Sequence, residues 1–451
     1  MHVFKYFFLI WLLSFFQTYA QNNFSIINKQ EKEKISFKLV NNLVLLPVVL
    51  NGEEFTFLLD TGVKQSLLFN VSTIDKINLN QVKKIKVKGL GQNVEFDALR
   101  SKGNLLRIGN VVCPNFDLLV ILDKKIDFSE RMGTDIHGII GSEIFKDLVI
   151  EVNYNTKKII FNKPESYQYK KCKKCETFPL SFYHQKPYIQ GSITTFSEIE
   201  YPVKLLIDSG GGDSLWLFGK SIDGYKIPNK NFTDLLGRGL SGDIFGKKSK
   251  LKSFNIGTFE FNNFIIAHPD STATIGSNFS SKRNGLMGAE ILKRFHVIYD
   301  YPHKKITFKK NKRFYGNHFP YNKSGMEIVY YGKVLVRERV SDAMFESKSL
   351  SQSVSKSGNN FTGNITSVYT TYSYSYKNAY QISYVKPNSI AAKVGILKGD
   401  LIAAINGRPA YEYTLQDIIQ LLSGEAKKKI KLKISRNFIL YKYNIVLEDL
   451  L

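Results

Sequence analysis

The sequence of 451 residues contains little cysteine and little histidine, three and seven residues respectively. Three cysteines are too few for a disulfide scaffold, and the histidines show no metal-ligand spacing. Cys172 and Cys175 have the spacing of a redox motif, but no βαβ pattern surrounds them and no second cysteine pair completes a zinc site. A local disulfide or two idle thiols is the favoured interpretation.

Long hydrophobic runs are absent beyond the amino terminus. A short basic start, an apolar run to Phe16 and the small residue Ala20 predict a secretory signal peptide over residues 1–20. We therefore expect an exported protein, placed in a periplasm, at a cell surface or outside the cell, with no membrane span after cleavage. An uncleaved anchor is the alternative, although the run is short for a span. Residues 21–34 are expected to form a leader. An inhibitory pro-segment that must be removed is the alternative interpretation of these residues.

Acidic residues are outnumbered, at 39 against 63 lysines and arginines, which gives a net charge of +24. The lysines are spread along the chain, many of them in pairs at expected turns such as Lys157-Lys158 and Lys304-Lys305. Because they form no single stripe, the excess does not favour nucleic-acid binding. A weak attraction to acidic surfaces stays open.

One short motif occurs twice. An apolar run leads into Asp60-Thr61-Gly62 and another into Asp208-Ser209-Gly210, with the aspartates 148 positions apart. The apolar residues predict a buried strand that ends at each carboxylate. A buried carboxylate is costly unless it is hydrogen-bonded or shares a proton with a neighbour. Because both aspartates occur in the same sequence context, the sequence favours a pair of carboxylates that share a proton.

Further landmarks repeat in the same order at nearly the same spacing, which indicates an internal duplication and two lobes related by a pseudo-two-fold axis. The landmarks are Gly89-Leu90-Gly91 with Gly237-Arg238-Gly239, Arg107-Ile108-Gly109 with Asn255-Ile256-Gly257, 138–145 with 285–292, and 153–161 with 300–308.

The pattern along the chain predicts mainly β structure. Asn51-Gly52 between two apolar runs is a strong hairpin signal. We expect lobe 1 over residues 35–165 and lobe 2 over residues 175–315, each with only short helices. A smaller α+β domain is expected over residues 320–451, interrupted by a Ser-rich insertion at 347–366.

The repeated motifs resemble those of bilobal aspartic proteases, and more closely the retropepsin-like branch often found in secreted bacterial proteins. The resemblance covers roughly residues 35 to 315 and rests on both aspartate motifs, each followed about 77 residues later by Ile139-Ile140-Gly141 or Leu286-Met287-Gly288. It implies that Asp60 and Asp208 are catalytic and that the two apolar-Gly segments pass behind them. It also implies that the hydroxyls of Thr61 and Ser209 bond across the lobes, beside Gly62 and Gly210, with no metal or other cofactor. Val63 and the run Gly210–Gly212 depart from the family pattern.

The chemistry of such a pair explains the residue types. Two adjacent carboxylates share one proton, so one member is a base for a water molecule and the other an acid for the scissile carbonyl. The glycine-containing repeats Gly89–Gly91 and Gly237–Gly239 are candidates for flap hairpins, with ordinary turns as the alternative. A dinucleotide-binding reading of Gly237–Gly242 is rejected because no βαβ unit or helix is expected there.

The last seventy residues resemble a bacterial PDZ domain through 387–395 and 399–407. Such domains add a peptide strand to a sheet edge beside a helix. The resemblance implies a carboxylate-binding loop at Ser324-Gly325-Met326-Glu327 and a groove helix at 414–422. A docking module that binds no free peptide is the alternative.

These observations predict an exported aspartic endopeptidase with a peptide or protein substrate and a PDZ-like appendage. The alternative from another class is a catalytically silent peptide-binding protein that keeps the protease fold.

Overall fold

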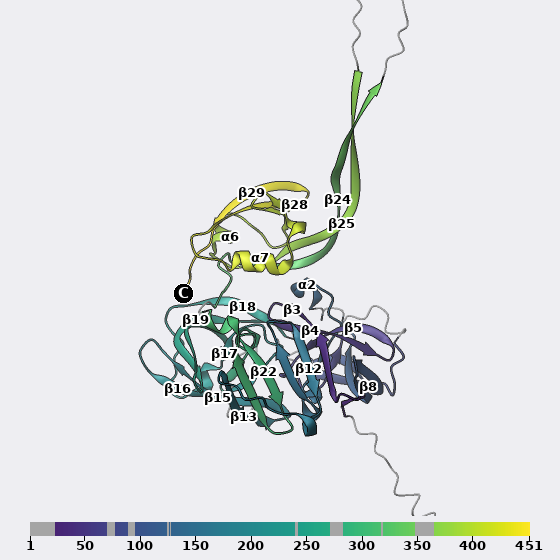
Figure 1. Cartoon of the computed structure of the whole chain (residues 1–451). Coiled ribbons are helices and arrows are strands. Elements are labelled where there is room, and N and C mark those ends of the chain that lie inside the picture. Colours follow the sequence, from purple (N-terminus) through teal and green to yellow (C-terminus); the bar gives the residue numbers. More distant parts are fainter. Residues whose placement is uncertain are drawn as a thin grey trace, which may run out of the picture. The chain divides into compact units, whose positions relative to one another are not determined.

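The computed structural model describes residues 23–69, 77–88, 95–123, 126, 128–239, 242–270, 283–316, 319–347 and 365–451 (Figure 1). Two compact units form, one from Met1–Lys323 with Glu448–Leu451 and one from Ser324–Leu447. Phe319, Tyr321 and Leu451 are buried in the core of the first unit. The second unit is thus a few residues shorter at each end than the expected 320–451. The expected signal peptide, Gly89–Gly91 and most of the Ser-rich insertion lie outside the described residues.

The described part of lobe 1 contains a nine-stranded sheet. Asn51 and Gly52 both have positive φ values, 50° and 94°, and form the expected tight turn between β4 and β5. β10 then pairs with β5 in parallel and with β6 antiparallel. The strands are β1 (Ser25–Ile26), β3 (Lys38–Val40), β4 (Leu43–Leu50), β5 (Glu53–Leu59), β6 (Leu67–Leu68), β7 (Lys83–Lys88), β8 (Glu95–Ile108), β9 (Val111–Ile121) and β10 (Gly138–Ile140).

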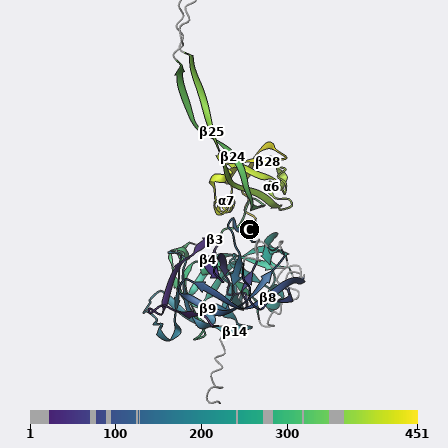
Figure 2. The ribbon, with the colours of Figure 1, turned by 90° about the vertical axis from the view of Figure 1, so that its right-hand side faces the viewer.

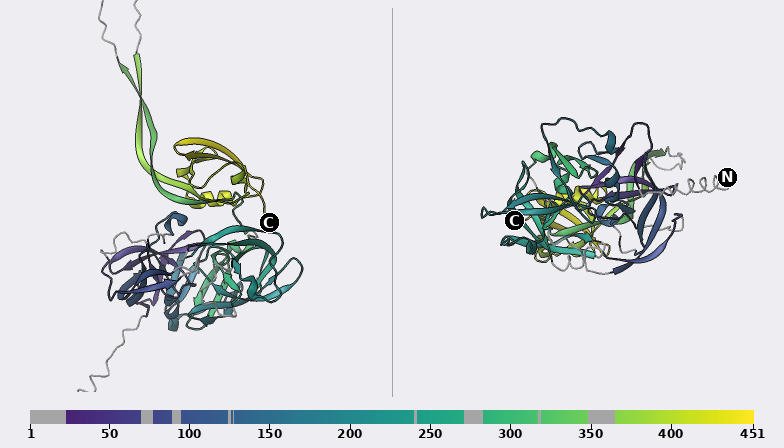
Figure 3. Two further views of the ribbon diagram at one scale, coloured as in Figure 1. Left: turned by 180° about the vertical axis from the view of Figure 1, so that it is seen from behind. Right: turned by 90° about the horizontal axis from the view of Figure 1, so that it is seen from below.

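Lobe 2 repeats this arrangement in an eight-stranded sheet of described residues. β21 pairs with β16 in parallel and with β17 antiparallel, as β10 does with β5 and β6. The equivalent pairings confirm the internal duplication, and Figure 3 shows the two lobes from behind. The strands are β14 (Ser181–Tyr183), β15 (Lys186–Thr194), β16 (Glu200–Ile207), β17 (Leu215–Leu217), β18 (Asn231–Gly239), β19 (Gly242–Ile256), β20 (Phe259–Pro269) and β21 (Gly285–Met287).

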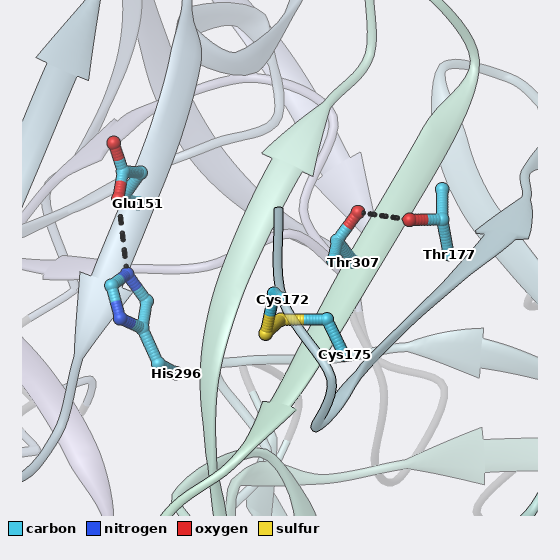
Figure 4. Close-up of a disulfide and its surroundings, with 6 residues drawn as sticks. All are labelled: Glu151, Cys172, Cys175, Thr177, His296 and Thr307. Carbon is cyan, nitrogen blue, oxygen red and sulfur yellow. Dashed lines mark hydrogen bonds and ion pairs between the residues drawn. A yellow bond between two sulfur atoms is a disulfide. The ribbon is translucent and has the colours of Figure 1, made fainter. Parts of the chain in front are cut away.

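A third sheet takes three strands from each lobe, in the order β13-β23-β22-β11-β12-β2. β11 and β22 meet antiparallel at its centre, where His296 Nε2 lies 3.1 Å from Glu151 Oε2 (Figure 4). At the start of the outer strand β13, Cys175 forms a local disulfide with Cys172. The strands are β2 (Lys32–Ser36), β11 (Val149–Asn153), β12 (Lys158–Asn162), β13 (Cys175–Pro179), β22 (Phe295–Asp300) and β23 (Lys305–Lys310).

The described part of the expected leader belongs structurally to lobe 1. β1 pairs with β9, and β2 pairs with β12 through residues such as Glu33 opposite Phe161. Only alternate residues of β2 are half-buried, as in a charged edge strand, so its sequence carries no strong hydrophobic signal. The lobe therefore begins before residue 35.

Helices in the first unit are short. The expected helical turns after the two apolar-Gly segments are present as α3 and α5. The helices are α2 (Ser129–Met132), α3 (Glu143–Asp147), α5 (Ala289–Leu292), and the 3₁₀ turns η2 (Pro164–Ser166), η3 (Gly219–Ser221) and η4 (Lys312–Tyr315). No helix of the described residues is long and apolar enough to cross a membrane.

The second unit is a small α+β domain with one long two-stranded ribbon. β24 and β25 form this ribbon, which extends well beyond the other strands of the unit (Figures 1 and 2). The expected caps are present, since Ser389 accepts a bond from Ala392 N and Thr414 forms a capping box with Asp417. The elements are β24 (Met326–Ser347), β25 (Ile365–Val385), α6 (Ile390–Lys393), β26 (Leu401–Ile405), β27 (Arg408–Pro409), η5 (Ala410–Glu412), α7 (Leu415–Leu422), β28 (Lys429–Arg436) and β29 (Ile439–Val446).

Candidate active site

Asp60 and Asp208 follow directly after β5 and β16, the equivalent central strands of the two lobes. The backbone N–H of Asp60 donates to Ile140 O at 2.9 Å, and that of Asp208 donates to Met287 O at 2.9 Å. The segments Ile139-Ile140-Gly141 and Leu286-Met287-Gly288 thus lie directly beside the two aspartate loops. The strands that end at the aspartates are hydrophobic and buried on both faces, so they hold each aspartate in a fixed position.

The residue after each aspartate connects the two lobes. Thr61 N–H donates to Ser209 Oγ at 3.0 Å, and Ser209 N–H donates to Thr61 Oγ1 at 3.0 Å. Each hydroxyl also donates across the junction, Thr61 Oγ1 to Ile207 O at 2.7 Å and Ser209 Oγ to Leu59 O at 2.9 Å. Both side chains are buried. Four reciprocal bonds therefore hold the aspartate loops against each other.

The following glycines bring each loop against the other lobe's carboxyl group. A Cβ atom on Gly62 would lie 2.8 Å from Asp208 Cγ, and one on Gly210 would lie 2.1 Å from Asp60 Oδ2. Only glycine fits at such a distance. The backbone of each loop also binds its own carboxylate, Gly62 N–H to Asp60 Oδ1 at 2.7 Å and Gly211 N–H to Asp208 Oδ1 at 2.9 Å.

The electrostatics favour retention of a proton on this pair. Burial raises the pKa of Asp60, and the neighbouring charge of Asp208 and a hydrogen bond with its side chain raise it further. The Gly62 N–H and the positive charge of Lys186 act in the opposite direction without reversing the shift. Two adjacent carboxyl groups that share one proton can supply one acid and one base.

Three charged groups near the dyad were missed from the sequence. Lys186 and Arg283 both act electrostatically on Asp208. Glu143 accepts a bond from Ser66 N–H at 2.8 Å. Its Oε2 atom is buried without a hydrogen-bond partner among the described residues. The signal for Glu143 was present, because Glu143 and Glu290 are matching members of the duplicated segment.

The lobe 2 candidate for a flap, Gly237–Gly239, lies in a hairpin, and its role as a flap stays a prediction. Gly237 and Gly239 belong to β18 in a β18–β19 hairpin, so strands surround the sequence that resembled a dinucleotide fingerprint. No group of three or more His, Cys, Asp or Glu side chains in the described residues is placed to hold a metal ion.

Ser324-Gly325-Met326-Glu327 lies at the start of β24, the edge strand of the second unit's sheet. Ser324 and Met326 are buried, Gly325 has a φ of 77°, and α7 contacts β24. Met326 N–H donates to Ser324 Oγ at 3.1 Å. The role of these four residues in peptide binding stays a prediction.

Comparisons with known proteins agree with both parts of this arrangement. Residues 46–144 match the aspartyl protease family model, and residues 381–436 match a PDZ domain model. The chain carries an aspartyl protease domain and a PDZ domain. The protease match includes Asp60 and Ile139-Ile140-Gly141 but ends before lobe 2. The assignment of Asp208 therefore rests on the duplication and on the contacts between the loops.

Solved structures similar to the chain include the aspartic proteinase from Irpex lacteus, at 12% identity and a TM-score of 0.40. That similarity covers 63% of this chain and 99% of the proteinase. No curated protein matches the sequence.

Proposed function

We propose that the protein is an exported aspartic endopeptidase that hydrolyses peptide bonds with a water molecule activated between Asp60 and Asp208. The observation that carries the proposal is the reciprocal packing of the two loops, in which each glycine contacts the opposite carboxyl group. A turn with only a structural role would not require a glycine packed against the opposite carboxyl group in both lobes. The aspartyl protease match over residues 46–144 supports the same reaction class.

The reaction uses one proton shared by the pair. The ionised carboxylate accepts a proton from water as the water oxygen attacks the carbonyl carbon of the peptide bond. The protonated carboxyl group donates to the carbonyl oxygen and stabilises its developing negative charge. Proton transfer to the amide nitrogen then allows the C–N bond to break and releases the two peptides. Because the pKa of Asp60 is raised, the singly protonated pair persists toward neutral pH.

Digestion of a broad peptide library between pH 3 and 7, followed by mass spectrometry, tests this proposal. We expect internal cleavage that a peptide mimic of the tetrahedral intermediate inhibits. A peptide-binding protein without turnover would bind the mimic and leave the library intact, which would contradict the proposal. Replacement of Asp60 or Asp208 with asparagine provides a sharper test, because it removes one member of the pair with almost no change in volume.

The PDZ domain supplies peptide or partner binding in this proposal. β24 is the edge strand of the described sheet and contacts α7, and PDZ domains add a peptide strand at such a sheet edge beside a helix. Calorimetric titration of the full chain with a random library of carboxyl-terminal peptides tests this part. Loss of binding on amidation of the terminal carboxylate is expected, whereas no binding of any peptide would favour a docking module.

Export accounts for the apolar amino terminus. Mass spectrometry of the protein recovered outside the cytoplasm of producing cells should find a first residue near Gln21. Recovery of a chain that begins at Met1 and remains in the cytoplasm would contradict export.

A further inference from the structure

The long ribbon of β24 and β25 in the second unit has two different faces. Residues directly opposite each other on paired strands share a face, and side chains alternate between the faces along each strand. One face of the described stretch carries eight residues, which we call the cation–tyrosine row. They are Lys333, Leu335, Arg337 and Arg339 from β24, and Asn378, Tyr376, Tyr374 and Tyr372 from β25.

The cation–tyrosine row combines exposed rings with exposed positive charge. Arg337 Cζ lies 3.4 Å from the centroid of the Tyr372 ring, as expected for side chains on one face. Lys333 and Arg337 are exposed, and no carboxylate of the described residues forms an ion pair with either. The row itself contains no Asp or Glu. Its apolar members are strongly exposed, at 58% for Leu335, 63% for Tyr374 and 71% for Tyr376.

The opposite face of the same stretch has paired charges and packs on its own unit. Lys377 Nζ lies 3.1 Å from Glu338 Oε2, which also accepts a bond from Ser375 Oγ at 3.2 Å. Lys377 Nζ lies 5.7 Å from the centroid of the Tyr411 ring in η5. The cation–tyrosine row therefore lies on the face directed away from η5.

Within the described residues, the row is not covered by a third strand or a helix. β25 pairs with β26 only at Gln381 and Leu401, so the stretch 333–339 with 371–378 is a two-stranded ribbon (Figures 1 and 2). A two-stranded ribbon is marginally stable in water, and a row of exposed apolar side chains marks a contact surface. A second copy of the chain does not fit, because the net charge of +24 and the two rows would repel.

We propose that the cation–tyrosine row binds the surface of a membrane that contains anionic lipids. Lys333 and Arg337 are attracted to lipid phosphates, and tyrosine rings are favoured at the level of the headgroups. Leu335 enters the boundary of the hydrocarbon layer, a gain that an acidic polymer dissolved in water does not offer. The net charge of +24 adds a long-range attraction to such a surface. The inference goes beyond the proposed function and does not depend on peptide cleavage.

Sedimentation of the full chain with lipid vesicles tests the proposal. We expect binding to vesicles of phosphatidylcholine mixed with phosphatidylglycerol, weaker binding to them in concentrated salt, and no binding to vesicles of phosphatidylcholine alone. Hydrogen exchange locates the contact on the chain. Exchange over 333–339 and 371–378 should slow when the mixed vesicles are added.

Variants on the two faces of the ribbon separate the row from the general positive charge. Lys333→Gln and Arg337→Gln should each weaken binding to the mixed vesicles about fivefold, and the double variant about 25-fold. Leu335→Ser removes no charge and should still weaken binding at least about fivefold. Lys377→Gln removes one charge from the opposite face and is the matched control, with little change expected. Circular dichroism spectra that match the unaltered protein show that each variant is folded.

Three results would overturn the proposal. Equal binding to both kinds of vesicle would exclude a role for the anionic lipid. A loss of binding in Lys377→Gln as large as in Lys333→Gln and Arg337→Gln would assign the attraction to diffuse charge rather than to the row. Binding of dissolved polyglutamate, with neither kind of vesicle bound, would make an acidic polymer the ligand.

Discussion

Replacement of Ser209 with alanine removes two hydrogen bonds at the junction of the lobes. Thr61 N–H loses its acceptor at 3.0 Å, and Leu59 O loses its donor at 2.9 Å. The site is buried, so water cannot readily replace the hydroxyl. Each unpaired backbone group costs about 1 to 3 kcal/mol, so the variant should lose about 4 kcal/mol of unfolding free energy.

That loss corresponds to a readily measured change in melting temperature. The entropy of unfolding is about 2 cal/mol/K per residue, or about 0.6 kcal/mol/K for a unit of about 300 residues, so the midpoint should fall by about 7 °C. Thr61→Val removes the same number of bonds on the other side of the junction and should give a similar loss. Differential scanning calorimetry of the full chain measures both.

Thr177→Val is the matched control. It removes one bond at 2.7 Å between Thr177 and Thr307, where the Thr177 side is exposed and water can take its place (Figure 4). Its cost should stay below about 1 kcal/mol. A Ser209→Ala variant no less stable than this control would refute the idea that the hydroxyls hold the two lobes together.

Three further predictions follow from close contacts and buried charges. Gly62→Ala places a Cβ 2.8 Å from Asp208 Cγ, so peptide cleavage should fall at least about 100-fold. Gly316→Ala, whose Cβ would make an ordinary contact with Arg313 O at 3.5 Å, should leave the rate unchanged. Burial raises the pKa of Glu143 from 4.5 to about 7, so its contribution to stability is full below about pH 4.5 and is lost as the pH rises through 7. Asp60, whose pKa is also raised, contributes a loss of its own over this range, so denaturant titrations should show a loss that is about 3 kcal/mol smaller in Glu143→Gln than in the unaltered protein. An equal loss in the variant would contradict this cause. Asp400 is buried and accepts two hydrogen bonds at 2.7 Å from Arg436. Asp400→Asn should therefore lower the free energy of unfolding by about 3 kcal/mol and speed hydrogen exchange in β26 and β28. Unchanged hydrogen exchange in these strands would contradict this prediction.

The aspartate loops could be predicted from the sequence because their signals are local and repeated. An apolar run that ends at Asp-Thr-Gly or Asp-Ser-Gly defines a strand and a turn, and the constant spacing makes Asp60 and Asp208 equivalent. The Asn51-Gly52 hairpin and the Thr414 capping box were likewise predictable, because each depends on a few neighbouring residues.

Features that depend on strand register or on edge strands could not be predicted in the same way. Lys186 and Arg283 are about 100 positions apart, and only the pairing of β15, β16 and β21 brings them to one face. β2 is a charged edge strand whose partner β12 lies more than 100 residues later, so no local pattern predicts that these residues of the expected leader form a strand of the sheet. In the ribbon of β24 and β25, the side chains described over 333–339 and 371–378 are exposed or half-buried, so no apolar pattern in these polar, tyrosine-rich segments predicts the strands.

The most direct test of the account compares initial rates of peptide cleavage for three single variants of the full chain. Asp60→Asn and Asp208→Asn each remove one member of the pair with almost no change in volume, and Asp97→Asn alters an exposed aspartate of β8 as the control. We predict that either dyad variant lowers kcat about 1000-fold or more while its melting temperature stays near that of the control. Cleavage by a folded Asp60→Asn or Asp208→Asn protein at the rate of Asp97→Asn would contradict the claim that these two carboxylates form the active site.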